Sequence, residues 1–373
     1  MAPENSNFTV KRDFEEKLIE DISLFRENIA VLGHRKTGKT LLLKKILNNR
    51  EKDIIPVYID LNKTSLSPEH FSIELIGNVL FWSSGADVSE YKNFMDIGYL
   101  LKKIINKKSS SFLKIIENEL LKIKPNQRLV VESAFGFLED ISKEKKLLVL
   151  LDNFEDILQL NNFSQIKNIL EIINLNNKNI RYCVASSSIS LCKKLLKNFK
   201  IVEIRNFNEN EINELFNLKD RDKINEIFRL TNGNPYLVNV LLNYLKNNEK
   251  DIKKIFFNEL IVRNSSIYSY CKEILQVSLE NARGQTMPRA ILKVLANLKE
   301  ATLTEIANKI YRSAPVTKSI IERLVEVDLI SKKDGKYSFE NPVLELFVRL
   351  TYNGYEFDEV PDDKILKKLE EEL

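Results

Sequence analysis

The sequence predicts an α/β fold in which helices cover both faces of a parallel β-sheet, followed by a smaller, mainly helical C-terminal part. Short runs of branched apolar residues alternate with helical patterns, and such runs are typical of strands buried on both faces of a parallel sheet. The first run also enters a glycine-containing turn that opens directly into a helix, as in a strand–helix–strand unit. The predicted strands are Ile29–Leu32, Ile54–Ile59, Leu147–Leu151, Ile180–Ala185 and Ile201–Ile204.

The composition is that of a globular protein and argues against several other classes. The chain has 373 residues, enough for two or three domains, with 43% hydrophobic and 29% charged residues. No apolar run reaches transmembrane length, so we expect no membrane partner and a cytoplasmic location. Three scattered cysteines and two histidines predict neither a disulfide framework nor a zinc site. A net charge of +4 permits binding to nucleic acid but does not argue for it.

The loop after the first predicted strand carries the most specific motif. Residues 33–40 fit the pattern G-x-x-x-x-G-K-[ST], the Walker A motif or P-loop. Its glycines let the backbone approach a ligand, and the N–H groups at the start of the next helix favour an anion. Lys39 can reach the β and γ phosphates, and the Thr40 hydroxyl can ligate Mg²⁺. We therefore predict a P-loop NTPase core that binds ATP and Mg²⁺ through Gly33, His34, Arg35, Lys36, Thr37, Gly38, Lys39 and Thr40.

A second motif supplies a carboxylate beside this loop. The apolar run Leu147–Leu151 ends at Asp152, which is the Walker B pattern, and Asp152 can hold Mg²⁺ together with Thr40. In many ATPases of this kind a Glu follows directly and polarises the attacking water, but here that position is Asn153. Either Glu155 acts as the general base from a different turn, or hydrolysis is slow and the protein is a nucleotide-gated switch. We favour a slow enzyme.

The remainder of residues 1–205 is interpreted as part of the same core. An amphipathic helix is expected over Glu15–Phe25, and Pro56 places the second strand at a sheet edge or a bulge. At the end of the Ile180–Ala185 strand, one of three serines either senses the γ phosphate or only caps the next helix: Ser186, Ser187 and Ser188. A helical insertion is expected over residues 68–144, with helices at Pro68–Trp82, Phe94–Ile105, Ser111–Leu121 and Arg128–Ile141.

A third motif links the chain to a known family. The element T-x-G-x-P at Thr231–Pro235 joins two predicted helices, and proline suits the first turn of the second. With F-x-x-x-R at Phe8–Arg12, the Walker A loop and L-L-D-N-F-E at Leu150–Glu155, the chain resembles the archaeal P-loop ATPases of the STAND division, a branch of the AAA+-like NTPases. The resemblance extends from about Asn7 to about Leu350. It implies that residues 206–286 form a helical lid, with Pro235 against the nucleotide.

Residues 287–352 are predicted to form a winged-helix domain, and residues 353–373 a charged, solvated tail. Three helical patterns precede a β-hairpin with Asp334-Gly335 at its tip: Pro288–Leu298, Thr302–Ile310 and Val316–Val327. Two functions compete for this domain. Its third helix could enter the major groove of DNA, or the domain could contact a protein or the lid.

The charges of this domain weaken the DNA interpretation. Lys332, Lys333 and Lys336 on the hairpin could contact the phosphate backbone. The candidate recognition helix, however, carries or precedes three acidic residues that would face phosphates: Glu322, Glu326 and Asp328.

The function predicted from these motifs is Mg²⁺-dependent hydrolysis of ATP, with Lys39, Asp152 and Glu155 as catalytic residues. Nucleotide state would set the positions of the lid and the winged helix. The lack of a guanine-selective N-K-x-D motif in the expected place favours adenine. The alternatives are a nucleotide-gated switch without turnover and a DNA-binding ATPase linked to replication or a mobile element. A protein partner or self-association is compatible with each.

Overall fold

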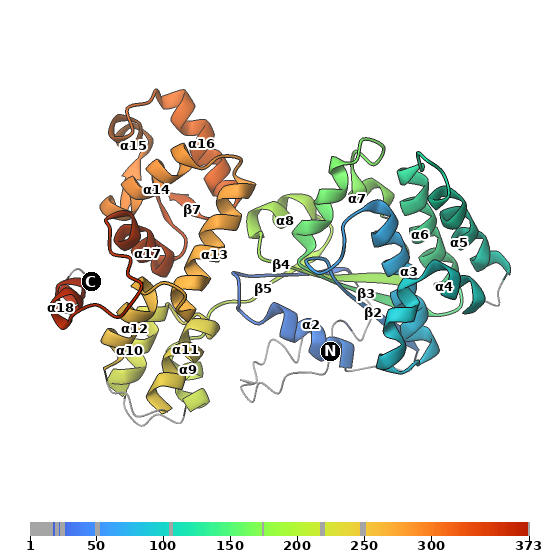
Figure 1. Ribbon diagram of the computed structural model, residues 1–373, viewed down its shortest axis with the longest axis horizontal. Helices are drawn as coiled ribbons and strands as arrows, with labels where there is room; N and C mark the ends of the chain where they lie inside the picture. Colours follow the sequence, from blue (N-terminus) through green and yellow to red (C-terminus); the bar gives the residue numbers. More distant parts are fainter. Residues whose placement is uncertain are drawn as a thin grey trace.

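The computed structural model describes residues 18, 22, 27–48, 53–103, 107–173, 175–216, 221–246 and 251–371. The chain forms two bodies, a sheet-containing core and a helical C-terminal half (Figure 1). The expected F-x-x-x-R segment at Phe8–Arg12 lies outside the described residues. Of the helix expected over Glu15–Phe25, only Leu18 and Ile22 are described, and both are buried.

The core contains a parallel sheet of five strands in the order β2-β3-β4-β1-β5, as the sequence predicted. The edge position expected from Pro56 is confirmed, because β2 is an outer strand and Pro56 pairs only with Leu148 of β3. The last strand begins and ends one residue earlier than predicted. The strands are β1 (Ile29–Leu32), β2 (Ile54–Asp60), β3 (Lys146–Asp152), β4 (Ile180–Ser186) and β5 (Lys200–Glu203).

Alternating residues of β1 are buried on opposite faces of the sheet. Ile29 and Val31 pack with α2 (Lys39–Asn48), whereas Ala30 and Leu32 belong to a separate cluster on the insertion side. Because both faces are covered, the strands are apolar throughout. The helices of the insertion lie at the end of the core away from the C-terminal half (Figure 1): α3 (Pro68–Ser84), α4 (Ile97–Lys103), α5 (Lys107–Leu120) and α6 (Gln127–Ile141).

The insertion differs from the prediction at one point. Instead of a single helix over Phe94–Ile105, the chain forms the 3₁₀ helix η1 (Val88–Met95) followed by α4. Asp96 causes the break, because its backbone is extended and its Oδ1 accepts a hydrogen bond from the Tyr99 amide at 2.7 Å. An aspartate in this conformation starts a new helix rather than continuing the old one.

The C-terminal half is built on one continuous hydrophobic core that runs from Ile212 to Leu369. Its first helices, which include the predicted lid, are α9 (Glu209–Phe216), α10 (Arg221–Thr231), α11 (Pro235–Lys246), α12 (Ile252–Ile261) and α13 (Ser266–Asn281). Because this core continues into the following elements, the division between lid and winged helix at residue 286 stays a prediction.

The elements after residue 286 have the order expected for a winged helix. They are α14 (Thr286–Leu298), β6 (Glu300–Thr302), α15 (Leu303–Lys309), α16 (Ala314–Glu326), β7 (Ile330–Lys333), β8 (Lys336–Phe339) and α17 (Pro342–Tyr352). The strands form an antiparallel sheet in the order β6-β8-β7. Asp334 and Gly335 at the hairpin tip have φ values of 50° and 81°, as the tight hairpin turn requires.

The prediction of a solvated tail is wrong for one face of its helix. In α18 (Asp363–Glu371), Leu366 and Leu369 are buried in the C-terminal core, and the helix packs against α12. Asp363 forms an ion pair with Lys254 of α12 at 2.7 Å. The high charge of the segment concealed two leucines spaced for one helix face. In the part of the chain that the structure describes, no helix is both long and apolar enough to span a bilayer.

Candidate active site

The P-loop connects β1 to α2 and is held in a tight path by its glycines. A side chain at Gly33 would place its Cβ 2.7 Å from the carbonyl oxygen of Ile204, which follows β5. Gly38 has a φ of 103°, a conformation that L-residues rarely adopt. The loop therefore needs glycine at both motif positions.

Lys39 lies folded into this loop and is almost fully buried. Its Nζ donates hydrogen bonds to the carbonyl oxygens of Gly33 and His34 at 2.7 and 2.6 Å. Burial lowers the pKa of Lys39 to about 8, although the nearby carboxylates of Glu155 and Asp152 act in the opposite direction. An anionic ligand in the loop would take over from the carbonyl groups and stabilise the charged ammonium.

Asp152 lies at the carboxyl end of β3, beside the P-loop. It accepts hydrogen bonds from the Tyr58 hydroxyl and the Asn153 amide, both at 3.1 Å, and from the Thr40 hydroxyl. Burial raises the pKa of Asp152, while the hydroxyl donors Thr40 and Tyr58 lower it. The structure thus brings together the two residues that were predicted to hold Mg²⁺.

Glu155 is placed away from Asp152 and against the serines that end β4. Its carboxylate accepts hydrogen bonds from the hydroxyl groups of Ser186 and Ser187, each at 2.6 Å, and from the Ser187 amide at 3.2 Å. Asn153 causes the displacement, because it adopts a left-handed conformation with a φ of 54° and donates from Nδ2 to Asp60 at 2.8 Å. The alternative that these serines only cap the next helix, α8 (Ile189–Leu195), has little support. Ser188 occupies the N-cap position but makes no side-chain hydrogen bond to the helix.

A cavity of about 470 Å³ opens above the P-loop. Most of the predicted site lines it: Arg35, Lys36, Gly38, Lys39, Thr40, Asp152 and Pro235. Gly33, His34 and Thr37 do not line this cavity. Their predicted contribution to nucleotide binding would therefore be to shape the backbone of the loop. His34 and Glu155 line a smaller neighbouring cavity between the core and the C-terminal half. Burial lowers the pKa of His34.

The opposite wall of the large cavity comes from the C-terminal half, and apart from Pro235 the sequence analysis did not predict it. Arg35 forms an ion pair with Glu273 at 2.7 Å, and the Lys36 ammonium lies 3.9 Å from the centre of the Tyr236 ring. Asn234 and Tyr270 donate hydrogen bonds to the Arg35 carbonyl oxygen at 3.4 and 3.3 Å. Tyr236 directly follows the predicted Pro235, whereas nothing in the sequence pointed to Tyr270 or Glu273.

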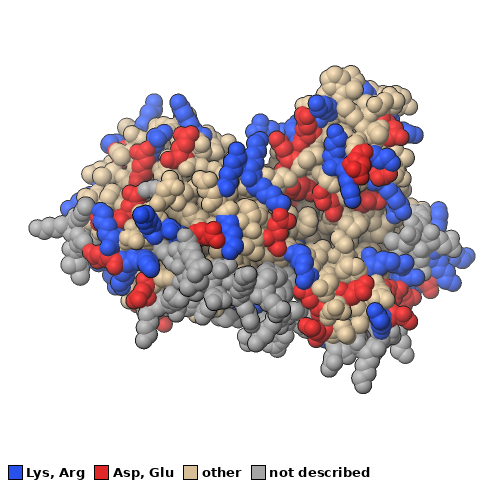
Figure 2. Space-filling model, turned by 180° about the vertical axis from the view of Figure 1, so that it is seen from behind, with Lys and Arg blue, Asp and Glu red and all other residues tan. Residues whose placement is uncertain are grey.

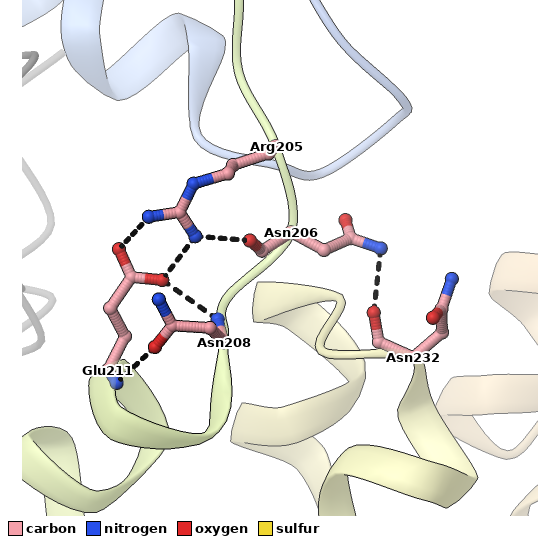
Figure 3. Close-up of polar contacts among 5 residues, drawn as sticks. All are labelled: Arg205, Asn206, Asn208, Glu211 and Asn232. Atoms are coloured by element: carbon pink, nitrogen blue, oxygen red, sulfur yellow. Dashed lines mark hydrogen bonds and ion pairs between the residues drawn. The ribbon is translucent and has the colours of Figure 1, made fainter.

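The connection between β5 and α9 is tied to the C-terminal half by polar contacts (Figure 3). Arg205 donates to both carboxylate oxygens of Glu211, at 2.7 and 3.1 Å. Asn208 and Glu211 exchange hydrogen bonds in a capping box at the start of α9, at 2.8 and 2.9 Å. Asn206 donates from Nδ2 to the carbonyl oxygen of Asn232 at 2.8 Å. The linker from Arg205 onward is thereby fixed to the T-x-G-x-P loop (Figure 3).

A family of ATPase domains found predominantly in Archaea matches residues 16–241 of the chain. The chain belongs to this archaeal ATPase family. The resemblance predicted from the motifs is confirmed at the level of the family, and this archaeal ATPase is an ATP-binding protein with a P-loop fold. Its assignment to the STAND division stays a prediction.

Solved structures agree with this fold. The chain is similar to a Walker-type ATPase of Pyrococcus abyssi, with a TM-score of 0.63 and 19% identity over 91% of this chain and 96% of that chain. The Aeropyrum pernix Orc1 protein, solved in complex with DNA, matches with a TM-score of 0.39 and 13% identity over 91% and 92%. At that score the second likeness supports no statement about fold or function. A comparison with curated proteins gives no significant match.

Proposed function

We propose that this archaeal ATPase binds Mg²⁺ and ATP in the large cavity and couples nucleotide state to the position of its C-terminal half. The observation that carries the proposal is the composition of the cavity wall. Lys39 and Asp152 of the core face the same space as Pro235 and Tyr236 of the C-terminal half. A ligand that fills this space contacts both bodies, so its presence and charge bias their relative arrangement.

The residues around Asp152 fit a magnesium ion. Thr40 and Asp152 offer a hydroxyl and a carboxylate oxygen, the ligand type that Mg²⁺ prefers. Asp152 is buried and hydrogen-bonded, yet it has no ion-pair partner among the residues that the structure describes. Burying a carboxylate without an opposite charge is unfavourable, and a cation would reduce that cost. When bound, the ion would neutralise charge on the phosphate oxygens, while Lys39 holds them from the loop.

Glu155 is the proposed general base, and its hydrogen bonds support slow turnover. Three donors from Ser186 and Ser187 hold the carboxylate in place. Ser187 also lines the large cavity. A γ phosphate that takes the Ser187 hydroxyl would remove one of the two hydrogen bonds to Oε1 of Glu155, so that this oxygen could accept a proton from water. Asn153 cannot take this role, because its side chain is an amide that already binds Asp60.

The test is Glu155→Gln, assayed for both hydrolysis and binding. We expect phosphate release to fall by at least about tenfold, because a general base contributes roughly 10²–10⁴-fold. ATP affinity should stay within about twofold, since the amide is neutral and of equal size. Asp156→Asn is the matched control, because it neutralises a neighbouring carboxylate whose hydrogen bonds come from Gln159 and Asn62 and not from the serines. Unchanged turnover in Glu155→Gln would show that Glu155 is not the base.

A nucleotide-gated switch without turnover is the second candidate, and the restraint of Glu155 by three hydrogen bonds favours it. Limited proteolysis with ATP, ADP or no nucleotide separates the two. A switch would show distinct cleavage patterns with ATP while releasing no phosphate above the Lys39→Ala background.

DNA binding is less well supported by the surface. Tyr311 in the turn before α16 is 87% exposed and Val316 in the first turn of α16 is 49% exposed, which suits a contact surface. However, Arg323 donates to the carbonyl oxygens of Ala282 and Arg283, and Lys336 is bonded to Glu300. Acidic and basic side chains are interspersed over the face in Figure 2 rather than separated into a basic patch. Salt-dependent binding to duplex DNA would be needed to support this function.

A further inference from the structure

Apolar and aromatic side chains form part of the wall that the C-terminal half gives to the large cavity. Phe207, Pro235, Tyr236 and Val238 line the cavity from this side, whereas Lys39, Thr40 and Asp152 line it from the core. A flat aromatic ring suits apolar and aromatic walls, and a triphosphate suits the P-loop side. The two walls therefore offer different surfaces to the two ends of a nucleotide.

One polar side chain among these walls has an unmet acceptor. Asn239 of α11 lies one helical turn after Pro235 and lines the cavity. Its Oδ1 is buried and has no hydrogen-bond partner. Of the described residues with such an atom, Asn239 alone lines this cavity. Buried acceptors are normally paired, so this carboxamide lacks a partner that a ligand can supply once the amide turns toward the cavity.

We propose that Asn239 reads the edge of the purine base and selects adenine, an inference that rests on the proposed nucleotide site. A carboxamide offers one acceptor and one NH₂ donor side by side. On its N6/N7 edge adenine presents the N6 amino donor beside the N7 acceptor, so both halves of the amide are satisfied at once. On the same edge guanine and hypoxanthine present O6 beside N7, two acceptors, and Oδ1 would face a lone pair. Rotating the amide by half a turn does not remove this mismatch.

Asn239 is a specificity residue in this proposal and plays no part in the chemistry. It belongs to the C-terminal half, whereas the phosphate groups would be held by Lys39 and Thr40 of the core. Its effect should therefore appear in the ratio of affinities for different bases, and the requirement for the P-loop should be unaffected.

The experiment measures the dissociation constants of ATP, ITP and GTP for the full-length chain by displacement of a fluorescent nucleotide. ITP replaces the N6 amino group with a carbonyl group and otherwise matches ATP. We expect the native chain to bind ATP about tenfold more tightly than ITP, the discrimination that an amide pair with a base typically gives. In Asn239→Leu, ATP affinity should fall by about the same factor while ITP affinity stays constant, so that the preference disappears.

The matched control is Asn243→Leu, at an exposed position on the same helix. It should leave the ATP-to-ITP ratio unchanged. Asn239→Ala provides a second variant if the leucine impairs folding, which the melting temperature would reveal. An unchanged ATP-to-ITP ratio in folded Asn239 variants would overturn the proposal for this residue. Equal ATP binding by the native chain and Lys39→Ala would instead overturn the nucleotide site itself, so the two failures are distinguishable.

Discussion

The carboxylate of Asp328 caps helix α8 across the boundary between the two bodies. Both of its oxygens accept a hydrogen bond from the Ser190 amide at 3.1 Å. Asp328 lies two residues after the end of α16 in the C-terminal half, and α8 begins two residues after Ser187, which binds Glu155. A movement of Ser187 would thus be carried over three residues to the contact between the core and the C-terminal half.

Replacing Asp328 with alanine should loosen this contact. The change removes a cap from the start of α8, an interaction typically worth about 1 kcal/mol. We expect hydrogen exchange of the Ser190 amide to accelerate about fivefold, because the open state becomes more populated by that amount. Glu326→Ala is the control, since Glu326 reaches Lys194 only at 4.0 Å on the exposed surface. Equal protection of Ser190 in both variants would contradict the cap.

ATP affinity should fall as the pH rises above 8. The Lys39 pKa of about 8 means that the nucleotide-free protein loses this ammonium above that pH, whereas triphosphate binding needs the charged form. Affinity should be full below pH 8 and fall by up to about tenfold for each further pH unit. The measurement is a binding titration from pH 6.5 to 9.5, and a constant affinity across it would contradict the assignment.

The same lowered pKa has a consequence for folding of the nucleotide-free chain. The pKa of Lys39 is about 8 in the folded chain and 10.5 in the unfolded chain, so between these values the unfolded chain binds more protons. The free energy of unfolding should therefore increase with pH across this window. Lys39→Met cannot titrate and should lack this contribution. Urea unfolding of both proteins across the window makes the comparison.

Replacing Tyr58 with phenylalanine should raise the lowest pH at which the protein binds ATP in a Mg²⁺-dependent way. The Tyr58 hydroxyl stabilises the ionised form of Asp152, so its loss should raise the pKa of Asp152 further. Mg²⁺-dependent ATP affinity should then decline at a higher pH than in the native chain. The control is Tyr91→Phe, which removes a hydroxyl that binds Asn78 in the insertion. Identical acid limbs for native and Tyr58→Phe would exclude this role.

Gly233→Ala in the loop before α11 should destabilise the protein more than the same substitution at a left-handed glycine with free space around it. Gly233 has a φ of +67°, and an added Cβ would lie 2.0 Å from the carbonyl oxygen of Phe207. We expect a loss of about 2 kcal/mol or more, the sum of backbone strain and a steric clash. Gly335→Ala at the hairpin tip is the matched control, because it has a φ of +81° and no atom within 4 Å. Its cost should be about 1 kcal/mol. Thermal unfolding of both variants compares the two, and equal losses would rule out the clash.

Local patterns were sufficient for the framework of this protein. The apolar runs predicted the parallel sheet, and Pro56 predicted its edge, because burial on both faces and a missing N–H group are properties of single strands. Gly33 to Thr40 predicted the P-loop, since phosphate binding there depends on a contiguous backbone. Asp152 followed from its place at the end of β3, where the parallel arrangement brings it to Thr40.

The sequence by itself determined the family and the phosphate-binding end of the site, while the tertiary structure decided what surrounds them. The partners of Glu155, Arg35 and Ser190 lie far away in the chain, and periodicity reports only which face of an element is buried. The same reason explains α18, where the charge was evident but the surface that buries Leu369 was not. Contacts between distant segments depend on how the two bodies pack, and no local pattern encodes that packing.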